Sequence, residues 1–184
     1  MRLFVAIALD EAIRENLISI QESIQKYQPD AKLVEAENIH LTLRFLGEVS
    51  EDTLPQICGV LSIINDYRCF EMELKNIGAF PSVKKPRVIW VGCEDSSFTL
   101  KKIHQALESG FKAIGLQPDD KEFSAHITLA RDKFPKADNN FEALVKKHAD
   151  KSLGIQIVKQ ITLFQSTLTS NGPIYANIRD FKLK

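Results

Sequence analysis

The chain has 184 residues and a mass of 20.8 kDa, which suits one domain or two small lobes that share a core. Hydrophobic residues make up 44% and charged residues 26%, a balance that excludes wholesale disorder. Lys plus Arg and Asp plus Glu number 24 each, so the formal net charge is zero. This disfavours a protein that coats nucleic acid along its length, because such proteins carry a basic excess. Any contact with nucleic acid is therefore expected to be local, at one end or one phosphate.

Apolar periodicity predicts alternating strands and helices, with no Pro/Gly/Ser-rich linker between them. Helices are expected where apolar residues recur every three or four positions behind a capping residue, and strands where apolar residues run together or alternate. In chain order, the predicted elements are a strand at Leu3–Leu9, a helix from the cap Asp10 to about Tyr27, a strand at Ile39–Leu46, a helix capped by Ser50 that carries Leu54, Ile57, Leu61 and Ile64, strands at Phe70–Leu74 and Arg87–Cys93, a helix from Ser96 or Ser97 to Gly115, a strand at Ser124–Ala130, a helix at Asn140–Ala149, and closing strands at Ile155–Thr167 and Ile174–Leu183.

A repeat runs through this order of elements. In each half a strand ends at an aspartate, Asp10 or Asp95, and a helix follows. The next strand then delivers a histidine, His40 or His126, at 30 or 31 residues after the aspartate. Two such units predict an α+β fold of two pseudo-symmetric lobes, each with a mainly antiparallel sheet and helices on the outside. We expect these lobes to be intertwined within a single domain, 1–184; the alternative is a coincidence of common α+β building blocks.

The cysteines and the N-terminal segment predict a cytoplasmic protein. Cys58, Cys69 and Cys93 form no C-x-x-C pair, and an odd number at these spacings is typical of reduced thiols. The apolar run at residues 3–9 stops at an acidic pair, and no small-residue cleavage site follows it as it would in a signal peptide. No run approaches the ~20 apolar residues that span a bilayer. We therefore expect a soluble protein with no membrane partner, and the balanced charge favours a monomer.

The two histidine strands carry the same motif, His-x-Thr-Leu, at residues 40–43 and 126–129. Because side chains alternate across a strand, the histidine and the threonine share one face while the residues between them face the core. With seven threonines and nineteen leucines in the chain, two matches among four histidines would arise by chance roughly once in ten thousand sequences. Each histidine alone would suit an ordinary place in a sheet, but the pair is a strong signal.

Two histidines with a hydroxyl beside each suit acid–base cleavage of a phosphodiester. A histidine pKa near 6.5 allows one imidazole to be neutral and the other protonated at physiological pH. One can then take a proton from an attacking oxygen while the other gives a proton to a leaving oxygen. Thr42 and Thr128 would donate hydrogen bonds to phosphate oxygens that gain charge in the transition state.

A metal centre is less well supported than this metal-independent chemistry. Neither motif strand places a second ligand beside its histidine, and zinc needs three or four protein ligands. The spare candidates, His104 and His148, are expected to be solvated helix residues. The chain also lacks a G-x-x-x-x-G-K-[ST] phosphate loop. We expect no metal and no cofactor.

The motifs and their flanks, His40-Leu41-Thr42-Leu43-Arg44-Phe45-Leu46-Gly47-Glu48 and His126-Ile127-Thr128-Leu129-Ala130-Arg131, resemble the paired signatures of the 2H phosphoesterases. More narrowly, the chain resembles the RNA 2′,3′-cyclic phosphodiesterases, also called 2′-5′ RNA ligases. The likeness covers almost the whole chain, through residues 2–7, 37–38, 78–81, 87–92, 166–169 and 172–175. No signature position departs from the family pattern.

The resemblance implies a bilobal fold with a central cleft lined by both motifs, and hydrolysis of terminal 2′,3′-cyclic phosphates of RNA to 2′-phosphates. In that scheme His126 is the proton acceptor from water, His40 is the proton donor to the 3′-oxygen, and Thr42 and Thr128 bind the phosphate. This division of labour comes from the family, because the two motifs are nearly symmetric in sequence. RNA ends with a cyclic phosphate, such as those of tRNA fragments, are the expected partner. A reversible, ATP-independent 2′-5′ ligation is a secondary expectation.

Two arginines are further candidates for phosphate contact. Arg131 closes the second motif, but strict alternation would point it away from the histidine, so the strand must end or twist just before it. A surface ion pair is the alternative for Arg131. Arg44 shares the predicted face of His40 and is a candidate for the same role, whereas Phe45 alternates toward the core.

Two features outside the motifs could contact the RNA itself. Phe80 could stack on the terminal base, as aromatic side chains often do in readers of single-stranded RNA, and packing beside Trp90 is the alternative. The basic residues of segment 84–87 could line the RNA backbone, or could simply form a solvated turn.

Three other functions compete with hydrolysis of RNA ends. The same site could act on small cyclic nucleotides or on ADP-ribose cyclic phosphate. An RNA-end-binding module with little turnover is disfavoured by the two histidines, since binding alone would favour lysine and arginine. A metallohydrolase would lose its activity in excess EDTA, whereas a metal-independent phosphodiesterase would not.

Overall fold

The computed structural model describes residues 1–119, 122–134, 139–170 and 172–184. Within these ranges no helix combines the length and apolar character needed to cross a membrane. The strands are β1 (Arg2–Ala8), β2 (Lys32–Leu33), β3 (His40–Glu48), β4 (Phe70–Ser82), β5 (Lys85–Glu94), β6 (His126–Arg131), β7 (Ser152–Val158), β8 (Gln160–Thr169) and β9 (Gly172–Lys182). The α-helices are α1 (Glu11–Tyr27), α2 (Leu54–Leu61), α3 (Thr99–Ala113) and α4 (Asn139–Lys147), and short 3₁₀ turns lie at Ala36–Asn38, Glu51–Thr53 and Ser62–Asp66.

All strand pairs are antiparallel, in the order β7-β4-β5-β6-β3-β1-β8-β9, with β2 added beside β6. The sheet is narrowest between β6 and β3, where a single residue pair, Leu41 with Ile127, joins the two strands. The predicted α+β class, with antiparallel sheets and helices outside them, is thus confirmed. The two expected sheets are halves of one continuous sheet that meet at this narrow join.

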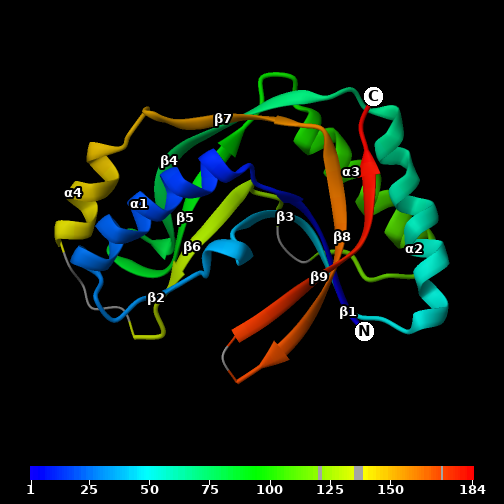
Figure 1. Ribbon diagram of the computed structural model, residues 1–184, viewed down its shortest axis with the longest axis horizontal. Helices are drawn as coiled ribbons and strands as arrows, with labels where there is room; N and C mark the ends of the chain where they lie inside the picture. Colours follow the sequence, from blue (N-terminus) through cyan, green and yellow to red (C-terminus); the bar gives the residue numbers. More distant parts are fainter. Residues whose placement is uncertain (120–121, 135–138, 171) are drawn as a thin grey trace.

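Each half of the sheet is covered by a helix that follows a strand of the other half (Figure 1). Helix α1 leaves β1 but packs against β6, β7 and α4. Helix α3 leaves β5 but packs against α2 and bonds to β3 through Arg44 and Glu108. The predicted apolar stripe of α1 is buried, as an amphipathic helix on a sheet requires, at Ile13, Leu17, Ile20 and Ile24.

The predicted strand at Ile155–Thr167 is wrong, because this segment forms two strands separated at Lys159. Strand β7 pairs with β4 at one edge of the sheet, whereas β8 pairs with β1 in the other half. The chain therefore crosses from one half to the other at Lys159. Both strands are apolar and β-branched, so local pattern gives no sign of the break.

Two helix starts also differ from prediction. Helix α3 is capped by Asp95, whose carboxylate accepts the backbone N–H of Thr99 at 2.6 Å and of Leu100 at 3.0 Å, and not by Ser96 or Ser97. A carboxylate satisfies two of the unpaired N–H groups of a first turn, where a serine hydroxyl satisfies one. The helix predicted behind Ser50 is instead a 3₁₀ turn, the short helix α2 and a second 3₁₀ turn.

Gly78 on β4 allows the indole of Trp90 on β5 to lie across its backbone. A Cβ at Gly78 would stand 2.3 Å from the Trp90 ring, far inside contact distance. The two residues are paired across the strands, so this close approach decides where the indole lies.

We predict that Gly78→Ala destabilises the protein by about 1–3 kcal/mol, because the added methyl must displace the indole. The free energy of unfolding in urea measures the effect. Gly59→Ala is the matched control, since a Cβ there meets no atom within 4 Å, and its effect should be clearly smaller. Equal unfolding free energies for the two variants would contradict the packing role of Gly78.

Candidate active site

A β-bulge interrupts β3 directly after the threonine of the first motif. In the pairing with β1, Thr42 is opposite Ala6 and Arg44 is opposite Val5, so Leu43 has no partner. An extra residue in one strand reverses the alternation of side chains beyond it. The residues that follow Leu43 therefore face opposite directions from those that strict alternation predicts.

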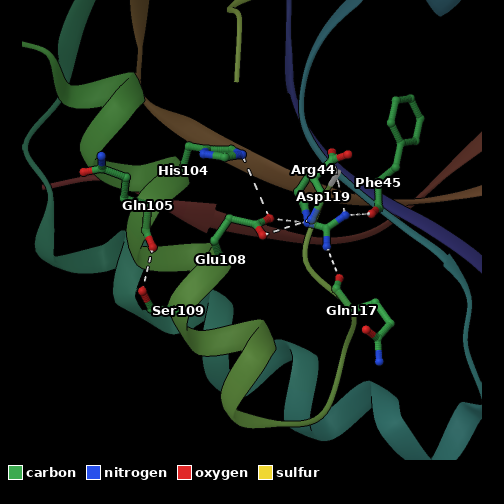
Figure 2. A network of polar contacts seen from close by, with 8 residues as sticks. All are labelled: Arg44, Phe45, His104, Gln105, Glu108, Ser109, Gln117 and Asp119. Carbon is green, nitrogen blue, oxygen red and sulfur yellow. Dashed lines mark hydrogen bonds and ion pairs between the residues drawn. The ribbon is translucent and has the colours of Figure 1, made fainter. Parts of the chain in front are cut away.

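This bulge makes two sequence predictions wrong. Arg44, expected beside His40 on the phosphate face, is only 6% exposed and bonds to groups on the reverse face, as Figure 2 shows. Phe45, expected in the core, is 55% exposed and its ring lies near that of Phe4, with centroids 5.9 Å apart. Apolar content alone could not reveal the exchange, because a bulge depends on how two strands pair.

Strand β6 has the corresponding bulge. In the pairing with β5, Thr128 is opposite Trp90 and Ala130 is opposite Ile89, so Leu129 has no partner. Leu129 and Ala130 are both fully buried, and the exposed Arg131 follows them. The change of direction expected just before Arg131 is produced by this bulge. It places Arg131 on the same face of the sheet as Thr128.

The two motif histidines lie on neighbouring strands. Leu41 is paired with Ile127 in an antiparallel register. Extending that register by one residue in each direction places His40 beside Thr128 and Thr42 beside His126, all on the face opposite the two paired residues. Each histidine thus has a threonine two residues along its own strand and another across the join.

Both imidazole rings are held by the same hydrogen bond. His40 Nδ1 lies 2.7 Å from the carbonyl oxygen of Asn38, and His126 Nδ1 lies 2.6 Å from that of Ser124. A carbonyl oxygen only accepts, so Nδ1 carries the proton in each ring and Nε2 is the nitrogen left to exchange protons. His40 Nε2 lies 2.9 Å from the hydroxyl of Thr42.

The environment of His40 favours its neutral form. Burial lowers the pKa of His40, the Asn38 carbonyl works in the opposite direction, and the positive charge of Arg131 lowers the pKa further. Arg131 lies at the end of β6, in the other half of the sheet from His40. The ring of His40 packs against Phe4, with centroids 5.0 Å apart, and meets the edge of Tyr175 at 5.4 Å.

A cavity of about 200 Å³ opens beside His40. Its lining includes aromatic rings and side chains of both charge signs. Burial raises the pKa of the Tyr175 hydroxyl, which keeps it a neutral hydrogen-bond donor. The aromatic lining residues are Phe4, Phe164 and Tyr175, and the charged ones include Arg14, Glu35 and Glu37.

A second group of aromatic rings flanks His126. The ring of Phe80 meets the His126 ring edge-on, with centroids 5.2 Å apart, and the ring of Trp90 lies 6.1 Å away. Phe80 also packs against Trp90 at 5.2 Å, yet 39% of its surface is exposed. The two alternatives for Phe80 are therefore compatible: it packs on the indole and still offers a face beside the histidine.

Sequence reasoning missed the aromatic surroundings of His40. Phe4, Phe164 and Tyr175 come from β1, β8 and β9, which are distant in sequence from the motif. The available signals were the resemblance at residues 2–7 and 172–175, which include Phe4 and Tyr175 without giving either a role.

The two remaining histidines lie apart from the motifs, His104 in helix α3 and His148 directly after helix α4. The prediction that His104 is solvated is wrong, because it is only 9% exposed and stacks on Phe123. His148 is partly exposed just beyond α4. In the part of the chain that the structure describes, no three His, Cys, Asp or Glu side chains gather in the manner of metal ligands.

The family described as LigT like phosphoesterase matches this chain twice, over residues 7–90 and 91–175. The chain belongs to the LigT-like phosphoesterases. Each match contains one of the motif histidines, and the double match agrees with the repeat seen in the sequence.

Relatives and solved structures of this family are similar along nearly the full chain. A protein of Archaeoglobus fulgidus named RNA 2′,3′-cyclic phosphodiesterase is 36% identical over 99% of this chain and 100% of its own length. One of the same name from Aeropyrum pernix is 40% identical over 90% of this chain and 94% of its own. The crystal structure of E. coli LigT complexed with 3′-AMP has a TM-score of 0.79 at 28% identity, covering 99% of this chain and 97% of that one.

We predict that this LigT-like phosphoesterase loses stability as the pH falls below 6.5. An unfolded His40 takes up its proton near the ordinary pKa of 6.5, whereas the folded protein resists protonation to lower pH. The unfolded state then binds more protons, so the free energy of unfolding falls. Burial lowers the pKa of His104 as well, which adds to the loss. Urea unfolding at several pH values should show a smaller fall in His40→Gln than in the wild type; an equal fall would contradict the role of His40.

We also predict that Arg131→Gln raises the pKa of His40, because removal of the guanidinium removes a positive charge that opposes protonation. An NMR titration of the imidazole resonances measures the change. Arg87→Gln, which removes an exposed guanidinium from β5, is the matched control and should change the pKa of His40 less. An unchanged pKa in Arg131→Gln would show that the guanidinium does not act on His40.

Proposed function

We propose that this LigT-like phosphoesterase is an RNA 2′,3′-cyclic phosphodiesterase, a phosphoric diester hydrolase that opens a terminal cyclic phosphate to a 2′-phosphomonoester. The observation that carries this proposal is the matched pair of imidazoles on neighbouring strands, each with Nδ1 held by a carbonyl and Nε2 left for proton transfer. The full-length likeness to relatives of that name supports the same reaction and an RNA substrate.

His126 acts as the general base in this proposal. Its Nδ1–H is held by the Ser124 carbonyl, so a neutral ring presents the lone pair of Nε2 to a water molecule. The water oxygen bonds to phosphorus as its proton passes to Nε2. The Asn38 and Ser124 carbonyls hydrogen-bond to Nδ1 in both protonation states, which keeps each ring in place during the transfer.

His40 acts as the general acid. The bond between phosphorus and the 3′-oxygen breaks, and the proton on His40 Nε2 passes to that oxygen, which leaves a 3′-hydroxyl and a 2′-phosphate. Burial and Arg131 keep His40 neutral in the free protein. The cyclic phosphate carries a negative charge that favours the protonated ring. Substrate binding and protonation of His40 are therefore coupled, so the acid is charged when the substrate is present.

Three further groups stabilise the phosphate in this scheme. Thr42 and Thr128 donate hydrogen bonds to its non-bridging oxygens, and Arg131 adds a charge-assisted contact from the end of β6. The cavity beside His40 suits the nucleoside that carries the phosphate, because it adjoins the acid and offers aromatic faces. The similar structure of E. coli LigT is a complex with 3′-AMP, a nucleoside that carries a phosphate, which supports a ligand of this chemical class.

The same groups would catalyse ligation, a transesterification of the cyclic phosphate that competes with its hydrolysis. When a 5′-hydroxyl of a second RNA replaces water, the base and the acid take the same roles on a cyclic phosphate end and form a 2′-5′ linkage. No nucleotide is consumed, so the reaction is reversible and dilute water favours hydrolysis. We therefore expect hydrolysis as the main activity and ligation at high concentration of RNA ends.

The test of this function uses an oligoribonucleotide that ends in a 2′,3′-cyclic phosphate, with identification of the product isomer. A 2′-phosphate formed equally well in excess EDTA is the expected result. Cleavage of mononucleoside cyclic phosphates or ADP-ribose cyclic phosphate, with the oligonucleotide left intact, would assign a small substrate instead. Binding of the oligonucleotide without turnover would overturn the enzyme proposal in favour of an RNA-end-binding module, and loss of activity in EDTA would indicate a metallohydrolase.

We predict that His40→Ala and His126→Ala each lower kcat by about 100- to 10,000-fold, because each removes one of the two proton transfers. The pH profile of kcat should be bell-shaped in the wild type. Thr42→Ala should cost less, about 10- to 1,000-fold, as expected for loss of one donor to a charged oxygen. His148→Ala, beyond the end of α4, is the matched control for removal of an imidazole. A folded histidine variant with normal kcat would remove that residue from the mechanism.

A further inference from the structure

Arg44 forms a buried network that joins β3 to α3 and to the segment after α3 (Figure 2). Its Nε bonds to the carboxylate of Glu108 on α3, and its Nη2 donates to the carbonyl of Gln117. Its Nη1 donates to the carbonyl of Phe45 and lies 3.8 Å from the carboxylate of Asp119. The guanidinium thus holds groups from three parts of the chain at once.

The burial of this network shows that it is more than a surface ion pair. The side chains of Arg44 and Glu108 are 7% and 21% exposed, so their charges are largely removed from water. A charge removed from water is tolerated when it is paired and hydrogen-bonded, and removal of one partner is costly. The planar guanidinium reaches acceptors in several directions, whereas a lysine ammonium is a single point of charge.

A second contact continues from this network toward the second motif. The ring of His104 lies flat on that of Phe123, with centroids 4.2 Å apart and planes at 12°. His104 Nε2 is 4.0 Å from the Glu108 carboxylate. Phe123 is followed by Ser124, the residue whose carbonyl holds His126 Nδ1 at 2.6 Å.

The described residues of segment 117–125, which leads to His126, are therefore held at several points. Arg44 and Glu108 hold the start of this segment, because the Gln117 carbonyl accepts from Arg44 and the backbone N–H of Asp119 donates to Glu108 at 3.3 Å. His104 packs on Phe123 further along. At its end, the carbonyl of Ala125 accepts the backbone N–H of Cys93 on β5 at 2.9 Å.

We propose that Arg44 is a positioning residue for His126, acting through Glu108, Gln117 and the stacked pair His104–Phe123. These contacts hold the Ser124 carbonyl where it fixes the tautomer and the orientation of the His126 ring. The proposal rests on the proposed function, because it is as the general base that His126 needs this orientation. Arg44 touches no reacting atom.

In this proposal the strand of the first motif supports the histidine of the second motif, and the reverse does not hold. The counterpart of Arg44 in the second motif is Ala130, which is fully buried and has no side chain that could form a similar network. The carbonyl that holds His40 is fixed in another way. The side-chain amide of Asn38 donates to the carbonyl of Pro173 at 3.0 Å and to the carboxylate of Glu35 at 3.1 Å.

The test begins with Arg44→Lys, which keeps the charge and loses the fork of donors. We expect kcat to fall by about 10- to 100-fold with KM changed less than about twofold, because a misplaced base slows the chemical step. We also expect the NMR resonances of the His126 imidazole to shift while those of His40 stay in place. Arg68→Lys, at an exposed position, is the matched control and should change neither.

A second pair of variants keeps the test decisive if Arg44→Lys fails to fold. His104→Phe retains an aromatic ring against Phe123 and should keep kcat and the His126 resonances close to those of the wild type. His104→Ala removes the stack and should lower kcat and shift the His126 resonances. Thermal unfolding of each variant identifies the folded ones.

Three results would overturn the proposal. One is a wild-type kcat and unshifted His126 resonances in folded Arg44→Lys and His104→Ala. Another is an equal shift of the His40 resonances, which would indicate general loosening of the fold. The last is an equal loss in His104→Phe and His104→Ala. The resonances are measured without substrate, so they decide the positioning role even if the wild type fails to cleave a cyclic phosphate.

Discussion

The pairing of Leu41 with Ile127 is the contact on which the arrangement of the site depends. It is the one residue pair between β3 and β6, and it joins the two halves of the sheet. Because both residues face the core, the residues on either side of them face the opposite surface together. That geometry brings two histidines and two threonines, from motifs more than eighty residues apart, onto one small area. Helices α1 and α3, each of which follows a strand of one half and covers the other half, also link the two halves (Figure 1).

The two bulges then decide which charges surround the site. Each follows the threonine of its motif and reverses the alternation beyond it. In β6 the reversal brings Arg131 to the side of His40, where its charge lowers the pKa of that ring. In β3 it turns Arg44 to the reverse side and exposes Phe45. The two bulges thus give one half of the sheet a cation beside the site and the other half an aromatic ring, and the bulge in β3 turns Arg44 toward Glu108 and Gln117.

The electrostatic state of the histidines follows from these placements. Carbonyl oxygens hold Nδ1 of both rings, so the exchangeable position is Nε2 in each case. Burial and Arg131 together hold the pKa of His40 below its ordinary value, against the opposing hydrogen bond to the Asn38 carbonyl, and an anionic ligand would raise it. A site of this kind distinguishes its two imidazoles by their surroundings, although their motifs are almost identical in sequence.

The sequence by itself determined the α+β class, most of the strands and helices, the repeat and the motif residues that carry the proposed chemistry. These features depend on short-range periodicity and on a repeated four-residue pattern, which are legible without coordinates. Only the tertiary structure decided the break at Lys159, the reversed directions of Arg44 and Phe45, the burial of His104 and the aromatic surroundings of His40. The burial of His104 depends on the packing of α3 against Phe123. The other features depend on which strand pairs with which, and where the pairing slips by one residue. Such slips arise between segments distant in the chain, so no local pattern records them.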